Sequence, residues 1–92
     1  MRNLEYTTQF ERDFRRIKKN PSHKNFDGLV EAVVTNLQMD IVLDAKFRDH
    51  SLLGAYKDCR ECHIKPDLLL IYSKPNQETL ILIRLGSHSD LF

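Results

Sequence analysis

The second half of the chain holds a set of side chains suited to moving protons around a phosphate. Three of the four histidines, His50, His63 and His88, lie there together with Asp67 and Arg84. A histidine can act as acid or base near neutral pH, because its ordinary pKa of about 6.5 leaves both forms accessible. Cleavage of RNA without a metal needs a base for the 2′-hydroxyl, an acid for the departing 5′-oxygen and a cation for the phosphorane. Two histidines and an arginine meet those needs.

Side-chain alternation in the predicted last strand sets where two of these residues point. A period of two puts Arg84 on one face, and His88 joins that face if the strand stays extended. The same face is expected to carry Leu80, Leu82 and Gly86. A cation and a titratable ring would then lie on one side of the sheet.

An earlier strand contributes a second histidine. Glu61 and His63 share a face with Lys65, while Cys62 and Ile64 point the opposite way, toward the helices. Asp67 follows the Pro66 turn, and the preceding loop supplies His50. We hypothesise that antiparallel pairing gathers these residues, although a shift of register by one position would separate them. The expected cluster contains His50, His63, Asp67, Arg84 and His88.

Two amphipathic helices come before these strands. Phe10, Phe14 and Ile17 recur at helical spacing, and Thr8 followed by Glu11 has the capping-box pattern of a helix start. Asn20–Pro21 ends this helix. A second helix is predicted from the spacing of Leu29, Val30, Val33, Val34 and Leu37.

The predicted elements make an α+β fold in a single domain, residues 1–92. A short strand at 4–6 opens the chain, and 44–54 reads as an ordered loop. Three strands at about 56–65, 68–74 and 79–85 form an antiparallel meander, separated by proline-containing turns. We expect the two-helix hairpin to pack on one face of the sheet and to leave the other face open.

Composition favours an ordinary globular domain. The chain has 92 residues, 41% hydrophobic and 29% charged, with a net charge of +1. The first residues lack the apolar stretch of an export signal, and no apolar run could span a bilayer, so we expect a cytoplasmic protein. The basic positions of the first helix, Arg12, Arg15, Arg16, Lys18 and Lys19, suit either RNA phosphates or plain solvation.

Cys59, Cys62 and His63 form a C-x-x-C-H sequence, which is also the attachment pattern of c-type haem. The strand-like setting and the lack of any methionine after Met39 argue against haem. Zinc binding is disfavoured because residues three apart on an extended strand point to opposite faces. Two free thiols are the plain expectation in a reducing compartment.

Three segments together resemble the YafQ branch of the RelE-like toxins. They are RDHSLLG from Arg48, RECHIKPDLLLIY from Arg60 and RLGSHSDLF from Arg84, in the order and spacing of that family. The resemblance implies a RelE-type fold, endoribonuclease activity on mRNA, in many members on the ribosome, and no cofactor. It also implies neutralisation by a cognate antitoxin, through which operator DNA is bound, and no membrane partner.

Residue by residue, the resemblance implies catalytic positions with His88 as the favoured acid, Arg84 as the phosphate-binding cation and Phe92 as a substrate-contacting aromatic. The catalytic set is His50, His63, Asp67 and His88. Leu68 and Tyr56 stand where relatives often carry tryptophan, so base stacking can differ here. The alternative is a non-catalytic module of the same fold that binds an antitoxin or nucleic acid.

Overall fold

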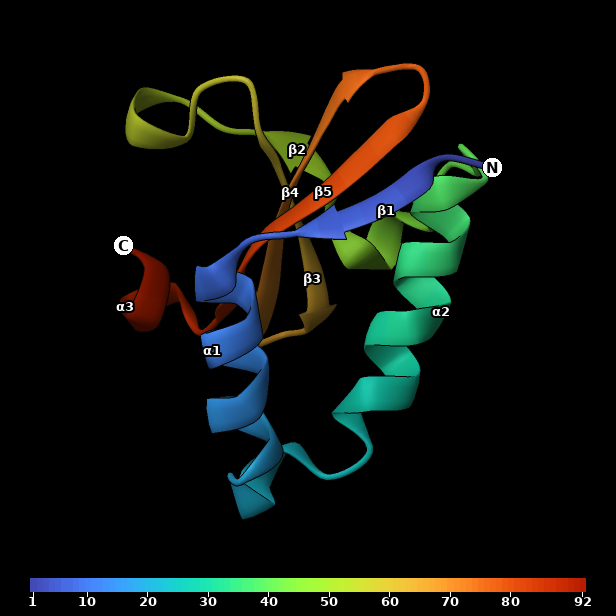
Figure 1. Cartoon of the computed structure of the whole chain (residues 1–92). Coiled ribbons are helices and arrows are strands. Elements are labelled where there is room, and N and C mark those ends of the chain that lie inside the picture. Colours follow the sequence, from blue (N-terminus) through green and yellow to red (C-terminus); the bar gives the residue numbers. More distant parts are fainter.

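A five-stranded mixed sheet and two long helices make up the computed structural model, which describes residues 1–92 (Figure 1). Strand order is β1-β5-β4-β3-β2, with β1 parallel to β5 and all other neighbours antiparallel. The elements are β1 (Asn3–Tyr6), α1 (Thr8–Lys18), α2 (Phe26–Gln38), β2 (His50–Ser51), β3 (Arg60–Lys65), β4 (Leu68–Asn76), β5 (Thr79–Gly86) and α3 (His88–Leu91), with 3₁₀ turns η1 (Pro21–His23), η2 (Ala45–Phe47) and η3 (Gly54–Tyr56). The predicted α+β class is confirmed.

Helix α1 begins at Thr8, as predicted, but its N-cap is the residue before the threonine of the capping-box pattern. Thr7 is its N-cap, and the Thr7 hydroxyl accepts a hydrogen bond from the Phe10 amide at 3.0 Å. The same hydroxyl donates to the Ile83 carbonyl at 2.7 Å, which ties the helix start to β5. A single threonine therefore caps α1 and fixes it to the sheet.

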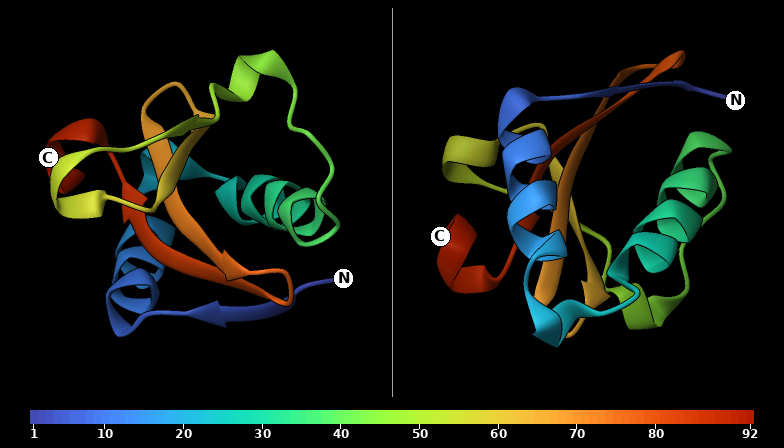
Figure 2. Two further views of the ribbon diagram at one scale, coloured as in Figure 1. Left: turned by 90° about the horizontal axis from the view of Figure 1, so that it is seen from above. Right: turned by 60° about the horizontal axis from the view of Figure 1, so that its bottom comes forward.

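Both long helices cover one face of the sheet, as the two views of Figure 2 show. The main core lies between the two helices and the sheet. It includes Phe10, Ile17, Val33, Leu37, Cys62, Ile64, Leu70, Tyr72, Leu80 and Leu85. Cys62 and Ile64 point toward the helices, which confirms the alternation predicted for this strand.

Two irregular pairings correct the predicted faces. Between β4 and β5 the register shifts after Ile71, so Leu82 faces the helices whereas Arg84 pairs with Ile71 on the opposite side. Between β3 and β4 a second shift puts Lys65 opposite the helix-facing Leu68 and not on the side of His63. An inserted residue reverses the alternation that follows it. The predicted common face of Leu82 with Arg84 and of His63 with Lys65 is therefore wrong.

The segment 44–59 also differs from the prediction. It contains η2, the short edge strand β2 and η3, and β3 begins only at Arg60, not near Tyr56. Gly54 and Asp58 have φ of 70° and 71°, so the chain turns there and cannot continue as a strand. The segment folds over the sheet face that was expected to be open, and there it meets α3. Leu69 and Ile71 are consequently buried beneath Leu91, Leu52, Tyr56 and Cys59.

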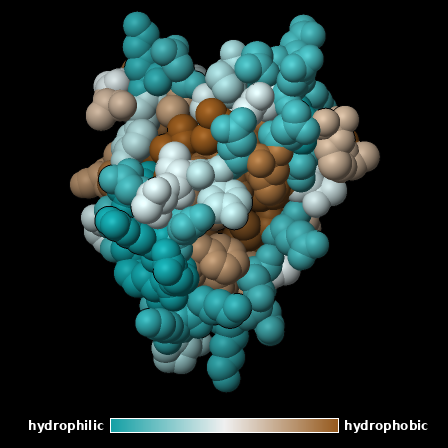
Figure 3. Space-filling model, in the orientation of Figure 1, coloured by the Kyte–Doolittle hydropathy of each residue, from teal (hydrophilic) through white to brown (hydrophobic).

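Hydrophobic side chains also gather at the surface between α1 and α2 (Figure 3). They line a groove of about 450 Å³ together with residues of β1 and β5. None of the helices has both the length and the hydropathy needed to cross a bilayer.

Candidate active site

Two histidines meet around one buried carboxylate. The β2–β3 register sets His50 opposite Glu61, and the period of two sets His63 beside it. His50 Nε2 lies 3.1 Å and His63 Nε2 3.9 Å from the same oxygen, Glu61 Oε2, and the two imidazole centroids are 6.4 Å apart. Glu61 is only 6% exposed, and its Oε1 has no hydrogen-bond partner. A buried carboxylate thus serves both rings.

The turn before β2 sets the tautomer of His50. Arg48 has a left-handed backbone (φ 51°), and its carbonyl lies 2.6 Å from His50 Nδ1. A carbonyl can only accept, so Nδ1 carries a proton and donates it there. The other ring nitrogen, Nε2, faces Glu61 Oε2. Asp49 holds the same turn to the sheet by accepting hydrogen bonds from the Tyr72 hydroxyl at 2.7 Å and Arg60 Nε at 3.2 Å.

Arg84 is held by a carboxylate from α1. Strand β1 pairs with β5 only as far as Leu82, which leaves the β5 edge unpaired beyond that point. Asp13 fills this gap: its Oδ2 accepts from the Leu85 amide at 3.0 Å and from Arg84 Nε at 2.7 Å, while its Oδ1 accepts from Arg84 Nη2 at 3.2 Å. The hydrogen bonds to Asp13 raise the pKa of Arg84, and a weaker one with the Tyr56 side chain raises it further.

His88 begins α3 and does not extend the strand, which corrects the extended geometry considered above. Ser87 and Asp90 form a reciprocal capping box: each side chain accepts from the other residue's amide, at 3.1 and 3.0 Å. The hydrogen bonds from Ser87 lower the pKa of Asp90. Gly86 is needed because a Cβ there would lie 3.1 Å from Asp90 Cβ.

Aromatic contacts orient the end of α3. The His88 ring centroid lies 5.0 Å from that of Phe92, and Phe92 meets Tyr56 edge-on at 5.8 Å. Phe92 is still 57% exposed, so its ring is accessible for stacking. Leu91, by contrast, is buried against Leu69 and Ile71 and anchors the helix.

Cross-strand pairing links the two groups. His50, Glu61, Ile71 and Arg84 form one row across four strands, and His63, Leu69 and Gly86 form the next row, which leads to His88. Strands in a sheet lie about 4.8 Å apart, so the histidine pair and Arg84 are separated by roughly 10–14 Å. The face therefore presents two clusters with an apolar stretch between them.

Asp67 is the predicted site residue that the structure does not bring into contact. It is exposed in the β3–β4 turn, and no hydrogen bond or ion pair joins it to a histidine. The β4–β5 register, with Leu69 opposite Gly86, puts Asp67 and His88 at the same end of the sheet. Glu61 is the site residue that sequence reasoning left without a role, although its i, i+2 spacing to His63 was the available signal.

The positions of Cys59, Cys62 and His63 do not suit the haem or zinc alternative. Cys62 is fully buried on the helix side, whereas His63 faces the other way and Cys59 packs beneath α3. Burial raises the pKa of the Cys62 thiol to about 12, so it stays protonated. No group of three His, Cys, Asp or Glu side chains is arranged to hold a metal ion.

Comparisons with known proteins agree along the whole chain. A family model described as bacterial toxin of type II toxin-antitoxin system, YafQ, matches residues 2–92. The mRNA interferase toxin YafQ of Escherichia coli K12 is 33% identical over 91 residues, which cover 99% of this chain and 96% of that one. A metal-bound toxin from Helicobacter pylori is 45% identical over all of both chains, with a TM-score of 0.88. The E. coli DinJ–YafQ complex gives 32% identity and a TM-score of 0.85, covering 100% and 99% of the two chains.

Proposed function

This chain belongs to the YafQ family of bacterial type II toxins, and we propose that it is an mRNA interferase that cleaves RNA by metal-independent acid–base chemistry. The observation that carries the proposal is the cross-strand arrangement of four side chains. His50 and Arg84 lie in one row, and His63 lies in the next row, which leads to His88. These side chains supply the base, the acid and the cation that the cleavage needs. Because the histidine pair lies roughly 10–14 Å from Arg84, the proposal requires bound RNA to draw the two clusters together.

The proposed reaction is a transphosphorylation. One imidazole of the His50–Glu61–His63 cluster takes the proton of the 2′-hydroxyl as the 2′-oxygen forms a bond to phosphorus. The bond from phosphorus to the 5′-oxygen breaks, and His88 gives a proton to that oxygen. The products are a 2′,3′-cyclic phosphate and a free 5′-hydroxyl, and no oxidant or cofactor is consumed.

The remaining side chains hold the substrate or the catalytic rings in position. Arg84 supplies the positive charge that stabilises the phosphorane, and Asp13 fixes its orientation through Nε and Nη2. Phe92 stacks on a base next to the cleaved bond. Glu61 is a positioning residue that orients the two rings beside it. Asp67, in the turn near His88, completes the set by orienting an imidazole once RNA is bound.

The proposed transphosphorylation uses no metal ion. The H. pylori relative is metal-bound, but the side chains here do not form a group of three ligands suited to a metal ion. His50 and His63 both face Glu61 Oε2, at 3.1 and 3.9 Å, and the second carboxylate, Asp67, lies in a separate turn. A chelator is therefore expected to leave the cleavage rate unchanged.

A cognate antitoxin is the expected protein partner, since E. coli YafQ forms a complex with DinJ. We further propose that the toxin acts in the cytoplasm on mRNA, in association with the ribosome, and reaches operator DNA only through that antitoxin. The competing hypothesis is a non-catalytic module of the same fold, which would bind the antitoxin equally well.

Primer extension on total RNA separates these two functions. Bacteria induced to express the wild type or His88→Ala are compared, with growth followed in parallel. We expect discrete new 5′ ends and growth arrest with the wild type, and a loss of about 10²-fold or more in cleavage with the variant. Identical RNA profiles from two folded proteins would refute the enzyme and favour the binding module.

A further inference from the structure

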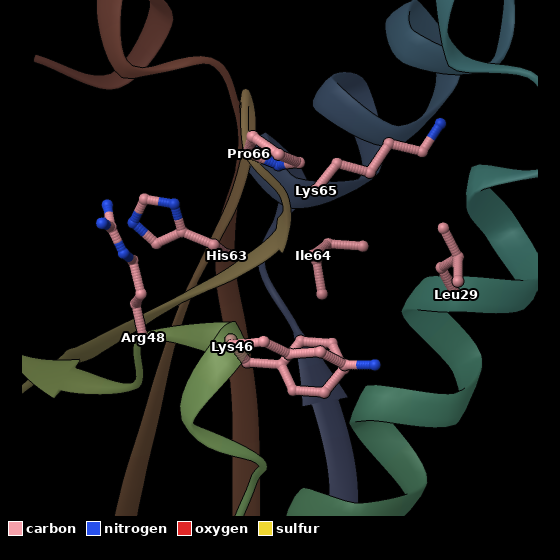
Figure 4. A pocket seen from close by; sticks show the side chains of 8 residues that line it. Leu29, Lys46, Arg48, His63, Ile64, Lys65 and Pro66 are labelled. Carbon is pink, nitrogen blue, oxygen red and sulfur yellow. The ribbon is translucent and has the colours of Figure 1, made fainter.

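A groove opens beside His63 at the end of β3. Its volume is about 590 Å³, and its walls come from α2, from η2 with the residue after it, and from the last residues of β3. Figure 4 shows Arg48 and His63 at one side of the groove and Leu29 of α2 at the other. His63 therefore borders both the histidine cluster and this groove.

Three cations line the groove and no carboxylate does. They are Lys46, Arg48 and Lys65, and none of them forms an ion pair. Lys65 Nζ donates to the Lys24 carbonyl at 3.4 Å, and Lys46 Nζ lies over the Phe47 ring, 5.2 Å from its centroid. The shifted β3–β4 register is what brings Lys65 here, because it turns this side chain away from the face of His63. Unpaired cations around a concavity create a local positive potential that attracts an anion.

The rest of the lining is apolar. Leu29, Phe47 and Ile64 contribute to the groove, and Phe47 offers an aromatic ring that packs only partly into the core. A flat base can pack on such a surface while cations hold the neighbouring phosphate. Single-stranded RNA combines these two features in each nucleotide.

We propose that this groove binds a nucleotide adjacent to the cleaved bond of single-stranded RNA, with its phosphate held by Lys46, Arg48 and Lys65. The inference rests on the proposed function, because it uses His63 as the point where the groove joins the reacting site. It assigns substrate binding to η2 and to the end of β3. Of the residues there, only His63 belongs to the predicted site.

The test measures binding without cleavage. The probe is a fluorescent single-stranded RNA ten-mer whose 2′-hydroxyls are methylated, so that no nucleophile remains. Wild type and the double variant Lys46→Gln/Lys65→Gln are titrated by anisotropy at several salt concentrations. Arg48 is kept, because its carbonyl holds His50. The matched control is Lys18→Gln/Lys19→Gln, which changes the last residue of α1 and its C-cap; neither lines this groove.

We expect the groove variant to bind about ten-fold more weakly and to lose roughly 1.4 from the slope of log affinity against log salt, about 0.7 for each lost phosphate contact. The control should bind within two-fold of the wild type. Equal affinity of wild type and groove variant would overturn the inference. So would normal RNA binding together with weakened binding of the antitoxin, since the occupant would then be an acidic protein segment.

The two proposals fail separately. Suppose that the wild type produces no new 5′ ends in cells, but its probe binding depends on Lys46 and Lys65. That result would refute the enzyme proposal and support the groove proposal. If the wild type cleaves RNA but its probe binding does not depend on either lysine, only the groove proposal is refuted.

Discussion

The two clusters of the candidate site, His50 with His63 and Arg84 with His88, are held by different means. His50 and His63 meet Glu61 through β-ladder register, so their positions are as rigid as the sheet. His88 instead belongs to α3, a four-residue helix held by its capping box and by Leu91. One half of the site is therefore built into the sheet itself, whereas the other half is attached to it through one short helix.

The largest expected effect tests whether the clusters act in one step. His63→Ala and His88→Ala should each lower cleavage by about 10²–10⁴-fold if one ring is base and the other acid. Groups that act as a unit are strongly non-additive, so the double variant should be little worse than either single one. Cleavage rates and thermal melting of all three proteins measure this, and losses that multiply in full would show independent roles.

Removal of Asp13 should affect both scaffold and site. Asp13→Ala leaves the Leu85 amide and the Arg84 guanidinium without their acceptor in a place where Asp13 is 3% exposed. We expect a loss of about 2–4 kcal/mol in the free energy of unfolding, and weaker cleavage because Arg84 loses its fixed orientation. Urea unfolding checks the first effect. Asp13→Asn, which keeps one acceptor oxygen, should lose less, and an equal loss would contradict this account.

Glu61 should matter less, because it acts through the rings beside it. Glu61→Gln keeps the size of the side chain but replaces a carboxylate oxygen that both imidazoles approach. We expect about a ten-fold lower kcat with a shifted pH–rate profile and little change in KM. The control Glu31→Gln changes an exposed carboxylate on α2. A Glu61→Gln enzyme with an unchanged pH profile would make Glu61 merely structural.

The smallest effect lies far from both clusters. Asp40 accepts hydrogen bonds from Lys74 Nζ and Arg2 Nε, each at 2.8 Å, and these lower its pKa to about 2. Because the folded-state pKa lies below the ordinary value of 3.8, the stabilisation is present above that pH and is lost as the pH falls through about 2. Asp40→Asn should therefore melt slightly below the wild type at pH 7 and equally at pH 2. A constant difference across that range would contradict the linkage.

Elements and their buried faces could be predicted where the signal is local. Helical spacing of Phe10, Phe14 and Ile17 located α1 to within a residue at its start, and alternation gave the inward direction of Cys62 and Ile64. Bulges carry no comparable sequence signal, since they arise from how two strands pair. That is why Leu80 and Leu82 were grouped with Arg84, and Lys65 with His63.

The sequence by itself determined the residue types of the site, the α+β class and the order of the elements, because composition and periodicity are properties of short segments. Tertiary structure decided the partners: His50 and His63 around Glu61, Arg84 on Asp13, and His88 on a short helix. Those contacts join residues up to 71 positions apart. They depend on strand register and on where β1 stops covering β5, and both are set only when the whole sheet has formed.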